Sequence, residues 1–190
     1  SFLCDIERDP ATEEDRWIAA IEWADSLGAQ VVNSSLGYTT FDDGTGYAYS
    51  DLDGSTALTT LAAEIAVARG IVVVVSAGNE GNTQWHYITA PADGPGVLAV
   101  GAVHPVNASL AQFSSRGPTA DGRIKPDVVA PGQQIVTVSG LGAGAGAEPF
   151  SLREYRRLSG TSFSAPIVSG ACALLLQLHP DWSPAQVAEA

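Results

Sequence analysis

The chain has 190 residues, 45% of them hydrophobic and 16% charged, which is enough to bury the core of a single domain. Twenty-one acidic residues against nine basic ones give a formal net charge of −12, which disfavours nucleic acids and anionic membrane surfaces as partners. The longest apolar runs, such as residues 173–176 with their neighbours, are shorter than the roughly 18–20 residues that a membrane span needs.

The first predicted element is a helix over residues 12–27. Thr12 is expected to cap it, and the acidic residues that follow suit the positive end of the helix dipole. Its apolar face carries Trp17, Ala20, Ile21, Ala24 and Leu27. Gly28 is expected to end the helix, and a strand is predicted over residues 31–33.

A second helix is predicted over residues 57–69, followed by an unbroken β-branched strand over residues 71–75. The side chains expected to face inward from this helix are Leu58, Leu61, Ala62 and Ile65, and Gly70 is its stop. Further strands are predicted over residues 97–103, 127–130 and 135–138, the last leading to a loop at 140–147.

A third helix, over residues 162–178, is apolar almost all round and is predicted to be buried at the centre of the domain. Ser183 and Pro184 form a strong start for a further helix. The alternation of helices with continuous apolar strands predicts a three-layer α/β/α fold with a mostly parallel sheet. Residues 1–5 read as a strand already in progress, so we expect residues 1–190 to be a partial domain, incomplete at both ends.

One serine lies where a loop passes into the third helix, within the segment Gly160-Thr161-Ser162-Phe163-Ser164-Ala165-Pro166. The helix dipole and the first-turn amides favour negative charge beside the Ser162 hydroxyl, as nucleophilic chemistry requires. A serine in this place more commonly serves only as a helix cap.

A second polar segment, residues 76–81 with the sequence SAGNEG, follows the predicted buried strand. A glycine-flanked polar residue such as Asn79, placed after a buried strand, is a common way for a parallel sheet to present a side chain. Taken alone, Asn79 more commonly just tolerates a left-handed turn. The two segments together favour an active site.

Both segments resemble motifs of the subtilisin-like serine proteases, G-T-S-x-S-A-P and A-G-N-x-G. Residues 31–37 (VVNSSLG) resemble the strand and S-L-G segment of the family, while residues 113–118 and 125–132 resemble two scaffold pieces. The resemblance runs from about residue 13 to the C-terminus. It implies a subtilisin-like fold, peptide or protein substrates, and an extracellular or cell-envelope location.

The resemblance also implies roles for single residues. Ser162 would attack the peptide carbonyl carbon, and the oxyanion would be held by the Asn79 side-chain amide and the Ser162 backbone amide. The implied substrate-binding residues are Ser35, Leu36 and Gly37 on one side of the first specificity pocket, Ala77 and Gly78 on the other, and Glu80 at its rim, where it would help the pocket tolerate basic side chains.

Two members of the family's Asp-His-Ser triad have no counterpart in the sequence. Residues 53–55 (DGS) have the wrong order for the D-[ST]-G turn, and none of His86, His104 and His179 is followed by the glycine of the H-G motif. His86 is the one alternative base, although a loop histidine packed on aromatic neighbours is the commoner case. Because a serine hydroxyl is a poor nucleophile without a positioned base, we expect these 190 residues alone to be inactive. We also expect them to self-associate, because a partial domain exposes the edges of its sheet.

No cofactor is required by this chemistry. Calcium is compatible with the resemblance, and Asp51 and Asp53 offer oxygen ligands, but their spacing completes no recognised calcium loop. We therefore assign no metal site. Cys4 and Cys172 are too few for a disulfide framework and are interpreted as small buried hydrophobic residues.

Three other functions stay open. A catalytically dead peptide-binding module would keep the cleft strands and use Ser162 only as a cap. A hydrolase of the sedolisin type would carry an aspartate as oxyanion donor, and Asn79 disfavours it. A purely structural domain would need neither motif.

Overall fold

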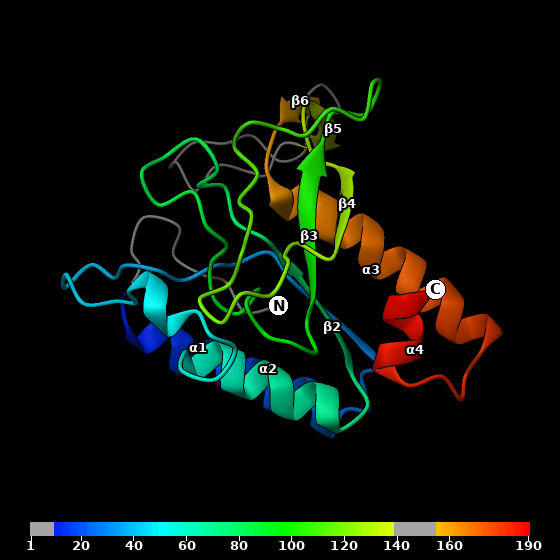
Figure 1. Ribbon diagram of the computed structural model, residues 1–190. Coiled ribbons are helices and arrows are strands. Elements are labelled where there is room, and N and C mark those ends of the chain that lie inside the picture. Colours follow the sequence, from blue (N-terminus) through cyan, green and yellow to red (C-terminus); the bar gives the residue numbers. More distant parts are fainter. Residues whose placement is uncertain (1–9, 139–154) are drawn as a thin grey trace, which may run out of the picture.

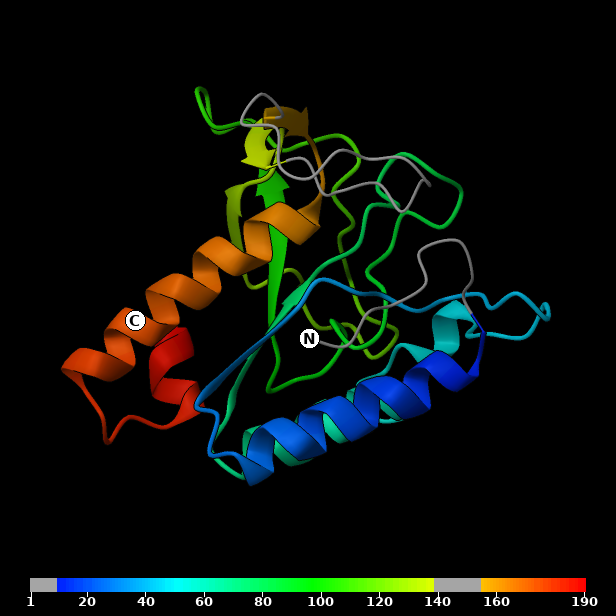
Figure 2. The same ribbon diagram turned by 180° about the vertical axis from the view of Figure 1, so that it is seen from behind.

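The computed structural model describes residues 10–138 and 155–190, which form three layers of helix, sheet and helix. The sheet has four parallel strands in the order β1-β2-β3-β4: Val31–Ser34, Val72–Ser76, Leu98–Val103 and Val128–Pro131. One face is covered by α1 (Thr12–Ser26) and α2 (Leu58–Ala68), and the other by α3 (Thr161–Leu178) and α4 (Pro184–Glu189) (Figures 1 and 2). The predicted fold class is confirmed.

The central strands β2 and β3 are buried over their whole length, as the β-branched run at residues 72–75 predicts. Successive side chains of β2 alternate between two cores. Val73 and Val75 pack in the core under α1 and α2, and Val72 and Val74 in the core under α3 and α4. Each fully buried valine contributes about 1.5–3 kcal/mol relative to an exposed one, so this strand joins the two cores.

Helix α1 lies where the sequence predicts it, but its N-cap is Ala11 rather than Thr12. Thr12 is already helical, and the Ala11 side chain makes no cap hydrogen bond. The backbone instead closes the first turn, with the Glu13 amide donating to the Pro10 carbonyl at 2.8 Å. The predicted stop is confirmed, because Gly28 adopts φ +76°, a left-handed conformation that favours glycine.

The predicted inner face of α2 is wrong at three of its four positions, since only Ala62 among them packs against the core. Leu58, Leu61 and Ile65 are exposed, and the residues that face the core are Thr59, Thr60, Ala63 and Ala66. Two buried carboxylates account for this rotation of the helix. The Thr59 hydroxyl donates to Glu14 at 3.3 Å, and the Thr60 hydroxyl donates to Asp93 at 2.5 Å. A buried carboxylate without such donors would be strongly destabilising, so the threonines take precedence over the leucines.

Helix α3 spans the predicted residues but is not buried at the centre of the described structure. It packs across all four strands on one side, while Ile167, Leu174 and Leu178 on its other side are exposed. The helix has 18 residues and is apolar enough to cross a membrane by length and composition alone. The prediction that every apolar run is shorter than a membrane span needs is therefore wrong for this helix. Its contacts with the sheet are those of a helix within the domain.

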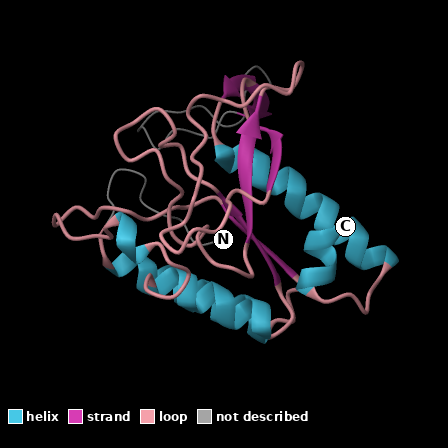
Figure 3. Ribbon diagram, in the orientation of Figure 1, coloured by secondary structure: helices cyan, strands magenta, loops and turns pink. Residues whose placement is uncertain are grey.

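Strand β5 (Ile135–Val138) pairs antiparallel with a strand that the sequence analysis missed, β6 (Tyr155–Leu158). This hairpin leads directly into the turn before α3 and is seen beside the N-terminal end of that helix (Figure 3). The predicted strand at residues 1–5, Cys4 and the loop at 140–147 lie outside the described residues. Cys172 is buried, as predicted.

The buried Glu14 should make stability depend on pH. Burial raises the pKa of Glu14 above its ordinary value of 4.5, against the opposing effect of hydrogen bonds from Tyr47 and Thr59. The folded state then holds the proton more tightly than the unfolded state. The stability that Glu14 contributes is therefore present below about pH 4.5 and is lost as the pH rises through the raised pKa, by up to about 1.4 kcal/mol per pH unit.

Urea unfolding from pH 4 to pH 8 measures this effect as the difference in unfolding free energy between the wild-type protein and Glu14→Gln. As the pH rises through this window, the wild type should lose unfolding free energy relative to Glu14→Gln. Above the window the difference should become constant. Glu22→Gln changes an exposed glutamate of the same helix and should leave the pH profile unchanged. A constant difference between wild type and Glu14→Gln at every pH would contradict the assignment.

Candidate functional site

Ser162 is the second residue of α3, and the turn before it is fixed to the end of β4. The Gly160 amide donates to the Gly132 carbonyl at 2.8 Å. One turn into the helix, the Ser164 hydroxyl donates to the Ala130 carbonyl at 3.0 Å. Ser162 thus lies at the carboxyl ends of the parallel strands, where side chains from several strands meet and where the helix N-terminus favours negative charge.

Asn79 lies beside this turn and its side chain has a defined orientation. Its Oδ1 accepts the Thr161 backbone amide at 2.9 Å and the Thr161 hydroxyl at 3.1 Å. Because the Thr161 backbone N–H can only donate, the amide group cannot be flipped without losing that bond. The Nδ2 end is therefore directed away from Thr161 and is the donor that this side chain offers. The adjacent Gly78 has φ +107°, a conformation that an L-residue rarely adopts.

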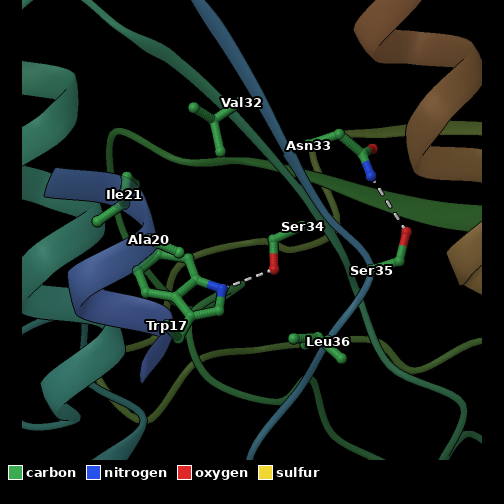
Figure 4. Close-up of a pocket in the computed structure, with 8 residues that line it drawn as sticks. All are labelled: Trp17, Ala20, Ile21, Val32, Asn33, Ser34, Ser35 and Leu36. Carbon is green, nitrogen blue, oxygen red and sulfur yellow. Dashed lines mark hydrogen bonds between the residues drawn. The ribbon is translucent and has the colours of Figure 1, made fainter. Parts of the chain in front are cut away.

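Ser35, which follows β1, is bonded to Ser162 in both directions. The Ser162 hydroxyl donates to the Ser35 carbonyl at 3.2 Å, and the Ser35 hydroxyl donates to the Ser162 carbonyl at 3.0 Å. The Asn33 side chain donates to the Ser35 hydroxyl at 3.3 Å (Figure 4). The structure thus brings three sequence-predicted site residues, Ser162, Asn79 and Ser35, together around the first turn of α3.

A pocket of about 220 Å³ lies between α1 and β1, the edge strand of the described sheet. Val32 lines it from β1, Leu36 from the segment after β1, and Trp17 from α1 (Figure 4). The indole Nε1 of Trp17 donates to the Ser34 hydroxyl at 2.9 Å and fixes the end of the strand. The Leu36 side chain thus lines this pocket beside Ser35, which itself contacts Ser162.

Glycine forms one position of each predicted pocket wall. Gly37 and Gly78 both approach the Thr89 side chain. Ala77 is buried, and its backbone amide donates to the Val100 carbonyl. Glu80 is half-buried. Its amide donates to the Ser115 hydroxyl at 2.9 Å, and its carboxylate accepts the Thr83 hydroxyl at 3.0 Å.

Each histidine makes contacts away from Ser162. His86 lies on the Tyr87 ring, with centroids 3.9 Å apart, and His179 stacks on Trp182 at 4.0 Å. His104 accepts the Val106 amide through Nδ1 at 3.2 Å. The hydrogen bond from the Ser162 hydroxyl goes to a carbonyl oxygen, which cannot act as a base. These contacts give no support to His86 as a substitute base.

The carboxylates considered as calcium ligands accept hydrogen bonds within local turns. The Asp53 carboxylate accepts hydrogen bonds from the Ser55 amide, the Ser55 hydroxyl and the Thr56 hydroxyl. These bonds, chiefly the one from the Ser55 amide, lower the pKa of Asp53 below its ordinary value. Asp51 accepts the Ala48 amide at 2.8 Å. Within residues 10–138 and 155–190, no group of three or more His, Cys, Asp or Glu side chains is arranged to hold a metal ion.

Thr161 has a larger part in the site than the sequence analysis assigned to it. Its hydroxyl accepts the Gly78 amide at 3.3 Å, and its one proton is shared between Asn79 Oδ1 and the Gly78 carbonyl, which lies at 3.2 Å. The residue is fully buried. Its position inside the Gly160–Pro166 segment indicated a place near the site. Its partner Gly78 lies 83 residues away in sequence, so only the fold reveals the contact.

Comparison with known proteins is consistent with this arrangement. A sequence model of the Subtilase family matches residues 4–190. A subtilisin of Bacillus pumilus is 40% identical over 173 residues, which cover 90% of this chain and 51% of that protein. Subtilisin E of Bacillus subtilis strain 168 is also 40% identical over 173 residues, covering 90% of this chain and 37% of its own length. The chain therefore spans about half, or less, of these relatives.

Solved structures give the same picture of the fold. Fervidolysin from Fervidobacterium pennivorans, a keratinolytic enzyme related to subtilisin, superimposes with a TM-score of 0.68 at 33% identity, covering 93% of this chain and 24% of that one. The self-cleaved protease domain of PatA superimposes with a TM-score of 0.64 at 30% identity, covering 93% of this chain and 56% of its own.

The Thr161 hydroxyl should be needed to hold α3 on the end of β2. Thr161→Val keeps the shape of the side chain but leaves the buried Gly78 amide and carbonyl without these bonds, which should cost about 1–3 kcal/mol of unfolding free energy. Chemical denaturation of the 190-residue chain measures the loss. Thr161→Ser keeps the hydroxyl and should lose clearly less; equal losses in both variants would show that the methyl group, not the hydroxyl, carries the stability.

Proposed function

Since the chain belongs to the subtilase family of serine peptidases, we propose that it forms the C-terminal part of the catalytic domain of a subtilisin-like endopeptidase. In this proposal Ser162 attacks the scissile peptide carbonyl and forms an acyl-enzyme. The observation that carries the proposal is the pair of bonds from Thr161 to Asn79 Oδ1. These bonds face Oδ1 toward Thr161 and leave Nδ2 as the end of the Asn79 side chain that can donate to a substrate oxygen beside the turn.

The oxyanion would be held by Asn79 Nδ2 and the Ser162 backbone amide. The first amides of an α-helix have no partner within the helix, so the Ser162 amide is a donor available at the site. In subtilisin itself, removal of one side-chain oxyanion donor lowers kcat by about 10²–10³. We expect Asn79 to contribute to a similar extent here.

The general base is proposed to lie outside the described residues, in a part of the protein that precedes this chain. Two observations support this: the described histidines make contacts elsewhere, and the chain spans about half, or less, of its relatives. The 190 residues alone are then inactive. The bond from the Ser162 hydroxyl to the Ser35 carbonyl is the resting arrangement that an incoming base would replace.

Peptide or protein chains are the proposed substrates, and an extracellular or cell-envelope site is the proposed location. The substrate backbone would lie along residues 35–37, with Ala77 and Gly78 forming the opposite wall of the specificity pocket. No cofactor takes part in these steps. A self-associating fragment is expected because β1 is an edge strand of the described sheet and α3 has an exposed apolar side.

A fluorophosphonate probe tests the nucleophile directly, because it reacts with activated serines. The full-length protein should be labelled at Ser162, the 190-residue chain should not, and Ser162→Ala should abolish the labelling of the full-length protein. Mass spectrometry of the labelled peptide locates the site. Labelling of the isolated chain at Ser162 would instead mean that a base lies within these residues.

A second candidate is a catalytically dead peptide-binding module that keeps the same walls. The contacts of His86, His104 and His179 away from Ser162 are the observation that favours it. Failure of the probe to label either protein, together with retained peptide binding, would select this candidate.

Glu80 is proposed to favour basic side chains at the rim of the pocket. In the full-length protein, Glu80→Gln should lower kcat/KM for peptides with Lys before the cleaved bond by about 2–5-fold, as expected for a partly exposed charge pair worth up to roughly 1 kcal/mol. Peptides with Phe at that position should be cleaved as before. An unchanged Lys-to-Phe ratio in the variant would remove Glu80 from the specificity site.

A further inference from the structure

Three polar side chains form a chain of hydrogen bonds that runs from α3 to the substrate-pairing segment of residues 35–37. The Ser169 hydroxyl of α3 donates to Asn33 Oδ1 at 3.0 Å, and Asn33 Nδ2 donates to the Ser35 hydroxyl at 3.3 Å (Figure 4). The Ser35 hydroxyl in turn donates to the Ser162 carbonyl at 3.0 Å. Two positions of α3 are thus connected to the end of β1 through side chains that lie more than 100 residues apart in sequence, at separations of 136 and 127.

The direction of the Asn33 amide decides where the Ser35 proton points. A hydroxyl has a single proton, so Ser35 can donate to the Ser162 carbonyl only while Asn33 presents its donor, Nδ2, to the Ser35 oxygen. The Ser169 hydroxyl favours this direction by donating to Asn33 Oδ1, although it shares its proton with the Ala165 carbonyl at 2.9 Å. A flipped amide would present its oxygen to Ser35 and draw the proton away from Ser162.

The bond from the Ser35 hydroxyl to the Ser162 carbonyl is the one that can persist during a reaction at Ser162. The other bond between these residues runs from the Ser162 hydroxyl to the Ser35 carbonyl at 3.2 Å. A serine nucleophile gives up that proton to its base, so the second bond is lost when Ser162 attacks. The first bond involves only the backbone of Ser162, and it keeps residues 35–37 connected to the turn that carries the nucleophile.

We propose that Asn33 is a positioning residue, which keeps the substrate-pairing segment in register with Ser162 by directing the Ser35 proton to the Ser162 carbonyl. The inference rests on the proposed function, because residues 35–37 have their role only through pairing with a peptide. Asn33 acts through the Ser35 hydroxyl and not on the peptide itself. A peptide paired with a displaced segment would present its carbonyl carbon to Ser162 at the wrong distance, which lowers the rate of attack.

Asn33→Asp in the full-length protein tests the inference, because it keeps the shape of the side chain and replaces the donor by an acceptor. The carboxylate should accept the Ser35 proton in place of the Ser162 carbonyl. For a tetrapeptide p-nitroanilide with Phe before the cleaved bond, kcat should fall by about 3–10-fold with a smaller change in KM, as expected for the loss of one hydrogen bond. Labelling of Ser162 by the fluorophosphonate probe should keep its wild-type rate, since the probe has no peptide backbone to pair with residues 35–37.

Gln30→Glu is the matched control, because it makes the same change from amide to carboxylate at an exposed residue just before β1. It should leave both kcat and the labelling rate unchanged. Asn33→Ala should lower kcat in the wild-type background but have no further effect in a Ser35→Ala background, since the residue acts through that hydroxyl. Wild-type kcat in Asn33→Asp, equal losses of cleavage and labelling in that variant, or additive effects of the two alanine substitutions would overturn the assignment of Asn33.

Failure of the proposed function looks different, because it would be seen in the wild type. If the full-length wild type neither cleaves the anilide nor is labelled at Ser162, the intact anilide is titrated into each protein by calorimetry. Weaker binding to Asn33→Asp than to Gln30→Glu would then support Asn33 as a positioning residue of a peptide-binding module. Equal affinities would overturn it.

Discussion

The first turn of α3 is bonded to the ends of three strands, and this constraint sets the geometry of the whole candidate site. Thr161 bonds to Gly78 and Asn79 after β2, Ser162 to Ser35 after β1, and Ser164 to Ala130 in β4. A shift of the helix along its axis would break bonds to all three strands together. The position of the Ser162 hydroxyl is therefore fixed by the sheet, even though the helix exposes much of its own outer side.

The constraint works because the strands are parallel and buried. Parallel strands place all their carboxyl ends at one edge of the sheet, so segments that are far apart in sequence meet there. β2 has apolar side chains on both faces and holds the two cores together. The loops after the strands then need only short polar side chains and a few glycines to bring Asn79, Ser35 and Ser162 into one group.

Local patterns in the sequence were sufficient for most elements and for the two motif segments. The run at residues 72–75 and the stop at Gly28 are read from neighbouring residues alone. The face of α2 was predicted wrongly because periodicity treats threonine as polar, whereas Thr59 and Thr60 satisfy carboxylates that are 45 and 33 residues away. Strand β6 was missed since its exposed side chains carry no apolar pattern.

The candidate site was likewise predictable from local patterns only in part. Ser162 and Asn79 stand in family motifs and were identified from the sequence, but the part that Thr161 plays depends on its contacts with Gly78 and Asn79, 83 and 82 residues away. Sequence patterns locate the reacting groups, and contacts between distant segments decide how these groups are oriented.

The exposed apolar side of α3 has a thermal consequence. Unfolding raises the heat capacity of a protein mainly by hydrating apolar surface that was dry in the folded state. Ile167, Leu174 and Leu178 are largely hydrated already in the described structure, so they add little to that change. The stability of this chain by itself should then curve slightly less with temperature than it would if these three side chains were covered.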